Sequence, residues 1–323
     1  MRRRSTFLAV LCVGFAGTMA QPAGAANVKI TPLGSHDGEF CRNDRALLFE
    51  DPDGTRILYD AGRTVRGPDD PRLGKIDAVL LSHVHEDHLG DGHPQAANAG
   101  TCGIPDLSVR TTPNSNTVNI VVAKKARFLL GGEMASFFAR KVQTVGGDPK
   151  QIQLLRFGGM AKVGGVGVAS VTAAHSNGLS PVFLEKELAD ALRANGLTAF
   201  VGSEGGYVVQ FTNGLVAYLS GDTGVTAEQD LVVRRYYKAN LAVINIGGTF
   251  TIGPAEAAYV ITDLVKPNAV IPSHANEAAT KDGKLISGTR THTFRNAVKI
   301  PVHVPLSGKT MEFDGSGKCV SGC

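Results

Sequence analysis

The sequence predicts an α/β fold in which short strands and helices alternate along the chain. Asp-Gly and Asn-Gly turn signals, each between two apolar runs, indicate two β-hairpins. Two further apolar runs are typical of buried strands. In chain order these elements are the hairpin of 46–50 with 56–59, the strand 78–82, the hairpin of 207–211 with 215–220, and the strand 241–246.

Helical patterns occupy the intervals between the strands. One segment has its apolar residues on a single helical face, and one ends at an Asn-Gly pair that suits a helix end. A third begins with a Thr-x-x-Gln capping box, and a fourth lies between two prolines. In that order the predicted helices are 133–142, 185–194, the segment that starts at Thr226, and 255–265.

The first residues have the pattern of a secretory signal peptide. Three arginines precede an apolar run, and Ala23-Gly24-Ala25 offers a cleavage site, with Thr18-Met19-Ala20 as the competing one. The apolar run is too short for a transmembrane anchor, so no stable membrane anchor is expected after cleavage. We therefore predict a signal peptide over 1–25 and a periplasmic or secreted single domain over 26–323. The general secretory and twin-arginine routes both stay open.

The charge of the exported chain excludes one class of function. Removing three arginines leaves 33 − 3 = 30 basic side chains against 29 acidic ones, a net charge of about +1. No block of Lys and Arg follows, so nucleic-acid binding is not expected, and a small-molecule substrate is. The sequence does not indicate an oligomeric state.

Four cysteines would remain in an oxidising compartment, where they allow three disulfide pairings. A Cys319–Cys323 pair would close a short loop and leave Cys41 to pair with Cys102. Two segments interrupt the chain: 90–117 is rich in Gly, Pro, Asn and Thr, and 176–203 contains one predicted helix. Because both begin beside histidines of the predicted site, we predict that they form walls or lids of a pocket.

The densest group of polar residues is the run His83-Val84-His85-Glu86-Asp87-His88, directly after an apolar strand. Imidazole and carboxylate are ligands that zinc, manganese and iron accept. Such a cluster is costly without a cation to share, because its groups repel one another and lose hydration. The run therefore predicts a metal site.

Four more residues of ligand type stand at the ends of other apolar runs, one before the His83–His88 run and three after it. Loops at one end of a sheet-rich sandwich come together, so these residues are expected to converge on the first cluster. They are Asp60, His175, Asp222 and His274.

The order H-x-H-x-D-H, His, Ser-Gly-Asp-Thr-Gly, His resembles the metallo-β-lactamase fold superfamily. Further segments, such as Ile246–Pro254 and Lys266–His274, are similar to its branch of metal-dependent hydrolases related to L-ascorbate-6-phosphate lactonase. The resemblance implies a four-layer αββα sandwich and two adjacent divalent metal ions, zinc first, with manganese or iron as alternatives. The implied ligands are His83, His85 and His175 for one ion, Asp87, His88 and His274 for the other, Asp222 as the bridge, and Asp60 hydrogen-bonded behind a ligand.

The function that this resemblance implies is hydrolysis by a hydroxide held between two metals, with Asp222 and Asp87 as the catalytic carboxylates. A small ester, lactone or phosphodiester is the expected substrate. Hydrolysis of β-lactams and a non-catalytic metal-binding protein on the same fold are the alternatives. A di-iron oxidoreductase is disfavoured, because such relatives carry Glu where this chain has His85. The turn from His274 to Glu277 departs from the branch pattern.

Overall fold

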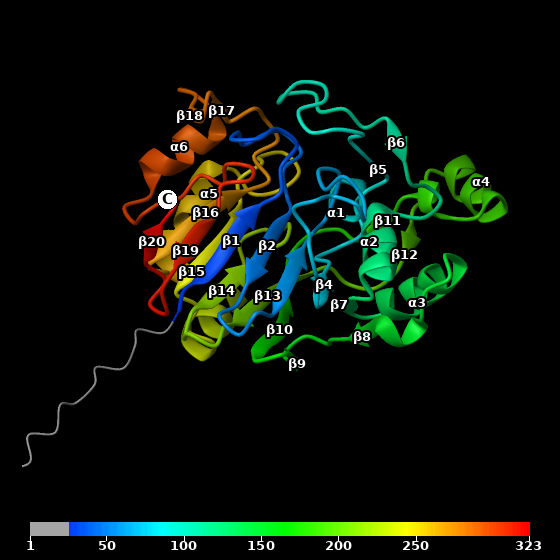
Figure 1. Ribbon diagram of the computed structural model, residues 1–323, viewed down its shortest axis with the longest axis horizontal. Helices are drawn as coiled ribbons and strands as arrows, with labels where there is room; N and C mark the ends of the chain where they lie inside the picture. Colours follow the sequence, from blue (N-terminus) through cyan, green and yellow to red (C-terminus); the bar gives the residue numbers. More distant parts are fainter. Residues whose placement is uncertain (1–25) are drawn as a thin grey trace, which may run out of the picture.

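The computed structural model describes residues 26–323, and the predicted signal peptide over 1–25 lies outside the described residues. Two mixed β-sheets face each other in the middle of the molecule (Figure 1). The first sheet has eight strands in the order β20 (Cys319–Ser321), β19 (Met311–Phe313), β1 (Val28–Pro32), β2 (Leu47–Glu50), β3 (Arg56–Tyr59), β4 (Ala78–Leu80), β7 (Arg127–Leu130) and β8 (Ile152–Leu154).

The second sheet has six strands, which the predicted hairpin and one predicted buried strand help to build. Strand β13 pairs with β14 antiparallel, as β2 pairs with β3 in the first sheet, so both hairpin predictions are confirmed. The order is β16 (Ala269–Ser273), β15 (Leu241–Asn245), β14 (Val216–Leu219), β13 (Gly205–Gln210), β10 (Val166–Thr172) and β9 (Met160–Val163).

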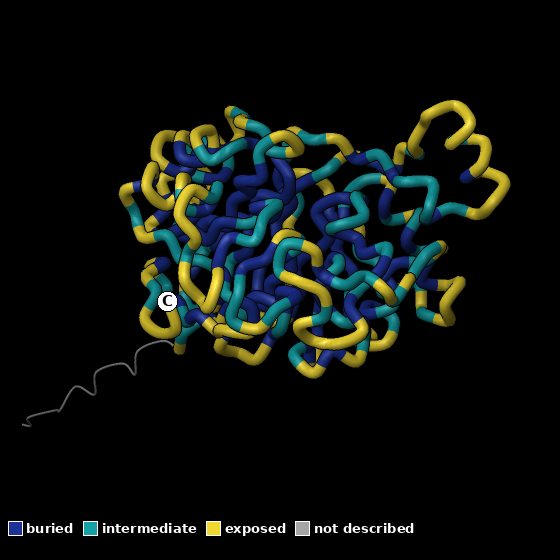
Figure 2. Tube along the Cα trace, turned by 90° about the horizontal axis from the view of Figure 1, so that it is seen from above, coloured by how far each residue is buried: buried dark blue, intermediate teal, exposed yellow. Residues whose placement is uncertain are grey.

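Both faces of the central strands of each sheet are buried. Successive side chains of a strand point to opposite faces, and in β2 Phe49 packs between the sheets while Leu48 packs on the outer side. In β15, Val243 faces the inter-sheet core and Ile244 faces the outer layer of the second sheet. Strands with two buried faces read as short continuous apolar runs, which is the pattern that predicted them. Figure 2 shows this buried interior surrounded by exposed loops.

Helices cover the outer face of each sheet, so the predicted four-layer αββα sandwich is confirmed. Helices α2 (Asn116–Lys124) and α3 (Met134–Thr144) pack on the first sheet. The second is covered by the π-helical segment Gln229–Tyr236, by α5 (Pro254–Tyr259) with its continuation Val260–Val265, and by α6 (Arg290–Ala297). None of the helices in 26–323 combines the length and apolar character needed to cross a membrane.

The capping box predicted at Thr226 is only half formed. The Thr226 backbone N–H donates to Gln229 Oε1 at 3.0 Å, but the Thr226 hydroxyl has no hydrogen-bond partner among residues 26–323. The helical segment begins later, at Gln229. Gln229 is buried and also donates to the Gly224 carbonyl at 3.1 Å, so tertiary contacts set this helix start.

The two interrupting segments have structure of their own. Segment 90–117 holds the two-residue strands β5 (Gly92–His93) and β6 (Val109–Arg110) and the start of α2. Segment 176–203 holds β11 (Gly178–Leu179), the short helix Pro181–Phe183, the predicted helix α4 (Lys186–Ala194) and β12 (Ala199–Phe200). Both lie beside the first sheet (Figure 1).

A disulfide ties segment 90–117 to the loop before β2. Cys41 and Cys102 are joined, and Cys319 pairs with Cys323, which is the pairing that the short-loop interpretation favoured. The first bridge spans 61 positions of sequence and the second spans 4. A longer closed loop restricts the unfolded chain more.

We expect Cys102→Ser to lower the free energy of unfolding by about 2–4 kcal/mol, because the unfolded chain regains the freedom of the long loop. Urea denaturation of the non-reduced protein, followed by circular dichroism, measures the change. Cys319→Ser is the matched control and should cost less, since its loop is short. Equal losses for the two variants would show that loop restriction is not the source of the stability.

Candidate metal centre

All eight residues of ligand type follow the carboxyl ends of strands at one edge of the sandwich. Asp60 follows β3, the His83–His88 run follows β4, His175 follows β10, Asp222 follows β14 and His274 follows β16. Strands β3 and β4 are parallel, as are β14, β15 and β16, so their carboxyl ends meet at this edge. The structure therefore brings together every predicted site residue.

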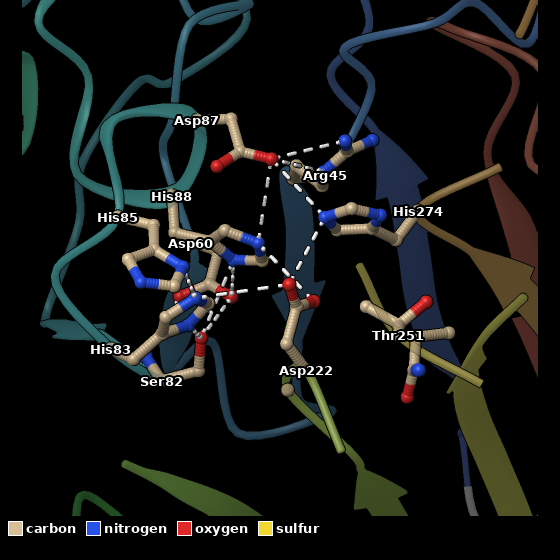
Figure 3. Close-up of polar contacts among 12 residues, drawn as sticks. Arg45, Asp60, Ser82, His83, His85, Asp87, His88, Asp222, Thr251 and His274 are labelled. Atoms are coloured by element: carbon tan, nitrogen blue, oxygen red, sulfur yellow. Dashed lines mark hydrogen bonds and ion pairs between the residues drawn. The ribbon is translucent and has the colours of Figure 1, made fainter. Parts of the chain in front are cut away.

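The local fold of the motif separates its ligands into two directions. His83 and His85 lie on the loop after β4, and His85 occupies the N-cap position of the four-residue helix α1 (Glu86–Leu89). Asp87 and His88 lie within that helical turn. One strand–loop–helix connection thus supplies donors to two neighbouring clusters (Figure 3).

The first cluster comprises His83, His85, His175 and Asp222, whose donor atoms lie within 4.8 Å of one another. His85 Nδ1 lies 3.0 Å from His83 Nε2 and 3.3 Å from His175 Nε2. Asp222 Oδ2 lies 3.7 Å from His83 Nε2 and 3.6 Å from His175 Nε2.

The second cluster comprises Asp87, His88 and His274. His274 Nε2 lies 3.1 Å from Asp87 Oδ2, and His88 Nε2 lies 3.8 Å from the same oxygen. Asp222 also contacts this cluster, because its Oδ2 is 3.1 Å from His274 Nε2 and its Oδ1 is 3.3 Å from His88 Nε2. Asp222 is therefore the residue that both clusters share.

A glycine allows Asp222 to approach the motif. Gly221 has φ +59°, and a Cβ at this position would lie 2.9 Å from the Ser82 Cβ and 2.8 Å from the Gly205 carbonyl oxygen. Any side chain here would push the Asp222 loop away from β4. The Gly221 N–H donates to the Tyr59 hydroxyl at 2.9 Å, which fixes the loop from below.

The donor atoms fit transition-metal ions. Tetrahedral zinc with bonds of about 2.0–2.1 Å places neighbouring donors roughly 3.3 Å apart, close to the separations in both clusters. Three buried polar atoms of these residues have no hydrogen-bond partner within 26–323: His88 Nε2, Asp222 Oδ1 and His274 Nδ1. Buried polar atoms are rarely left unpaired, and the first two face each other across the site, where a cation would satisfy them.

Electrostatics also favour a cation at this point. Burial alone would raise the pKa of Asp222, but His274 and His88 hold that pKa well below its ordinary value. Burial would lower the pKa of His88, yet Asp222 and Asp87 hold it well above its ordinary value. Burial and the neighbouring His88 lower the pKa of His83. The carboxylates thus stay ionised and concentrate negative charge around His88.

Asp60 holds His88 in the orientation that a metal ligand needs. Its carboxylate oxygen Oδ2 lies 2.8 Å from His88 Nδ1 and accepts from the Ser82 hydroxyl at 2.7 Å, while Oδ1 accepts from the Ser82 N–H at 2.8 Å. A carboxylate acceptor keeps a proton on Nδ1, so Nε2 is the nitrogen that faces the site and could bind a metal ion.

We expect Asp60→Asn to weaken metal binding about 10–100-fold, because the amide can donate to Nδ1 and so favours the tautomer with a proton on Nε2. Competition against a chromogenic chelator measures the affinity. Asp51→Asn is the matched control. Asp51 is also buried, but it follows β2 at the edge of the sheet away from the clusters and accepts hydrogen bonds from Thr212. Equal affinities for the two variants would contradict this role of Asp60.

Arg45 is a site residue that the sequence did not predict. Its side chain is 3% exposed, and its Nε and Nη2 donate to Asp87 Oδ2 at 3.3 and 3.1 Å. Nη2 also donates to Asn276 Oδ1 at 2.7 Å, and Nη1 donates to the carbonyls of Arg42 and Asp44. Arg45 therefore connects Asp87 to the turn that carries His274. The sequence feature that could have indicated Arg45 is a charged residue immediately before an apolar strand.

A cavity of about 540 Å³ opens above the clusters. Its lining includes the predicted ligands His85, Asp87, His175, Asp222 and His274, together with Gly247, Thr249 and Phe250. Of the two interrupting segments only Ser176 lines it, so the prediction that both form pocket walls is wrong. Segment 90–117 instead supports the site from behind, through the disulfide to Cys41 and the bond from the Arg42 N–H to the Cys102 carbonyl at 3.1 Å.

The sequence is similar to known proteins over most of its length. Residues 55–275 match the family described as Beta-lactamase superfamily domain. A metal-dependent hydrolase of Polynucleobacter asymbioticus is 26% identical over 309 residues, covering 93% of this chain and 92% of that protein. A metal-dependent hydrolase of Roseiflexus castenholzii is 31% identical over 235 residues, covering 70% of this chain and 77% of that protein.

Solved structures share the fold. A metallo hydrolase from the archaeon Ignicoccus hospitalis superposes with a TM-score of 0.58 at 22% identity, covering 89% of this chain and 99% of that one. A metallo-beta-lactamase fold protein from Bacillus subtilis gives 0.53 at 13% identity, covering 89% and 99%. Fold and site together define a metal-dependent hydrolase. The chain belongs to the metallo-β-lactamase superfamily, within its Beta-lactamase superfamily domain family.

Proposed function

We propose that this protein is an exported hydrolase that uses two metal ions to cleave a small ester, lactone or phosphodiester. The observation that carries the proposal is the position of Asp222, whose two carboxylate oxygens contact donors of both clusters at 3.1–3.7 Å. Imidazole and carboxylate donors favour zinc, with manganese or iron as alternatives.

Two bound metal ions would supply a water-derived nucleophile at neutral pH and stabilise negative charge on the reacting group. The chain itself orders the donors. Asp222 fixes the spacing between the clusters, and Asp60 orients His88 from behind. Arg45 and His274 both contact Asp87 through Oδ2, and Figure 3 shows Oδ1 without such a contact. We assign to Asp87 Oδ1 the transfer of a proton between nucleophile and leaving group.

The size of the cavity supports a small substrate. Its volume of about 540 Å³ falls within the range of small-molecule sites. The exposed Phe250 on its lining offers an apolar surface at the entrance.

Export is part of the proposal and rests on two features. The N-terminal sequence has the charge, apolar run and Ala-x-Ala site of a secretory signal. The Cys41–Cys102 disulfide supports an oxidising compartment, because such bonds are rare in the cytosol. Sequencing the N-terminus of protein recovered from the periplasm or medium should begin near Ala26. Protein that retains Met1 and stays in the cytoplasm would contradict export.

The activity is tested by metal analysis together with a substrate panel. We expect close to two transition-metal ions per chain and hydrolysis of simple lactones or of bis(4-nitrophenyl) phosphate, with little turnover of a chromogenic cephalosporin. A cephalosporin that leads the panel, with kcat/KM of about 10⁴–10⁸ M⁻¹s⁻¹, would favour the β-lactam alternative. Full metal loading without hydrolysis of any substrate would favour the non-catalytic metal-binding alternative.

A further inference from the structure

Arginines dominate the part of the cavity lining that lies outside the metal ligands. Arg42, Arg63 and Arg290 line it together with the buried Arg45. Glu86 is the one acidic residue of the lining that belongs to neither cluster. Metal ions in the clusters would add further positive charge, so the cavity is built for a negatively charged occupant.

Two of these arginines are occupied by partners within the protein. Arg63 Nε lies 2.6 Å from Asp91 Oδ1, and that carboxylate is mostly buried. Arg45 directs its guanidinium to Asp87, Asn276 and two backbone carbonyls. The donors of Arg45 are therefore not available to a ligand, and the charge of Arg63 is balanced by Asp91. Arg42 and Arg290 are the two arginines of the lining whose charge has no short ion pair.

Arg42 is a charged side chain on a fixed backbone. Its N–H donates to the Cys102 carbonyl, its own carbonyl accepts from Arg45 Nη1, and the preceding residue forms the disulfide. Its side chain is exposed and has no ion-pair partner within 4.0 Å in the described part of the chain. Because the backbone at Arg42 is already fixed, little backbone freedom is lost when its guanidinium binds an anion.

Arg290 is the first residue of α6 and also lines the cavity. Its one ion pair, from Nη1 to Glu277, is long at 3.5 Å, and Glu277 does not line the cavity. Arg290 Nε would lie 3.2 Å from a Cβ at Gly248, which has φ +79°. Glycine at this position therefore lets the guanidinium lie against the turn that forms the cavity wall.

We propose that the substrate carries a second anionic group, a carboxylate or a phosphate, apart from the bond that is cleaved, and that Arg42 and Arg290 bind it. This inference rests on the proposed hydrolase function and narrows its substrate class. Guanidinium groups bind these anions through charge-assisted hydrogen bonds. Substrates with a cationic group, such as a quaternary ammonium, are disfavoured by the same charges.

The kinetic test compares two esters that differ only in the distal group. The mono-4-nitrophenyl ester of glutarate carries a carboxylate where 4-nitrophenyl pentanoate carries a methyl group. With metal-loaded enzyme we expect kcat/KM for the anionic ester to be about tenfold higher or more, mainly through KM. Arg42→Gln and Arg290→Gln should each reduce this preference about tenfold, and Arg42→Lys should keep part of it.

Arg295→Gln is the matched control, because Arg295 is an exposed arginine on the same helix α6 but does not line this cavity. Equal kcat/KM for the two esters in wild type, with hydrolysis of both, would overturn the inference and leave the hydrolase proposal standing. An equal loss of preference in Arg295→Gln would overturn the assignment to Arg290.

Calorimetry tests the same inference without turnover. Metal-loaded protein should bind glutarate about tenfold more tightly than pentanoate, and the difference should disappear in Arg42→Gln with Arg290→Gln. If neither ester is hydrolysed, this titration alone decides the inference: equal affinities overturn it. The hydrolase proposal is then decided separately, by the panel of lactones and phosphodiesters. A parallel titration with 4-phosphonobutanoate distinguishes a preference for phosphate-like groups from one for carboxylate.

Discussion

Replacement of Asp222 by alanine is expected to remove bound metal and hydrolytic activity together. The variant loses the carboxylate that lies 3.1 Å from His274 Nε2, 3.3 Å from His88 Nε2 and 3.6 Å from His175 Nε2. Loss of a residue that merely supports a ligand costs about 10–100-fold, and a shared ligand should cost more than about 100-fold in metal affinity and in kcat/KM. Elemental analysis after dialysis and hydrolysis assays measure the two effects.

The control for this variant is Asp263→Ala, which removes an exposed carboxylate from the segment that packs on the second sheet. It should retain metal and activity. Asp222→Asn keeps the shape of the side chain and should lose metal to nearly the same extent, because the charge is what the amide lacks. A folded Asp222→Ala protein that still holds two ions per chain would refute the shared-ligand role.

Replacement of Arg45 by methionine is expected to destabilise the metal-free protein by about 1–3 kcal/mol. Removing a buried charged group leaves the acceptors that it satisfied without a donor, although His274 and His88 still face Asp87. Here Asp87 would lose its guanidinium partner, and the carbonyls of Arg42 and Asp44 would lose their donors. Urea denaturation in the presence of a chelator measures the change in free energy of unfolding.

Arg45→Lys separates charge from geometry. The ammonium keeps the positive charge but cannot reproduce the planar fork that reaches Asp87 and Asn276 together, so an intermediate loss is expected. Arg140→Met, at an exposed position of α3, is the control for loss of a surface arginine and should change stability by less than about 0.5 kcal/mol. A loss for Arg45→Met no larger than this control would mean that the buried pair adds nothing to stability.

The sequence predicted that these residues would meet because the rule that places them is local, whereas their roles as ligands came from the family resemblance. Asp60, His83, His175, Asp222 and His274 each follow an apolar run, and the carboxyl ends of neighbouring strands come together in this class of sheet. The chain order of His83, Asp222 and His274 therefore carried information about their meeting point. The hairpins were equally predictable, because turn chemistry around Asp53-Gly54 and Asn213-Gly214 acts over a few residues.

The contacts that the sequence could not predict are those between distant, unpatterned residues. The Arg45–Asn276 hydrogen bond joins positions 231 apart, and no local rule links an arginine before one strand to an asparagine after another. The departure noted at His274–Glu277 finds its structural explanation here, since Asn276 at φ +58° accepts from Arg45. The interrupting segments were assigned to the pocket because they start at ligands, but their direction depends on packing against the first sheet.

Because the donors come from both sheets, a bound ion would link the two sheets. Each cluster takes donors from both sheets: His83 and His85 meet His175 and Asp222, and Asp87 and His88 meet His274. Each bound ion would therefore cross-link the two sheets at their common edge. Neither half of the chain alone would present more than two donors of either cluster, so docking of the halves and metal capture become one equilibrium. Metal at 100 times its dissociation constant would then raise the free energy of unfolding by about 2.7 kcal/mol.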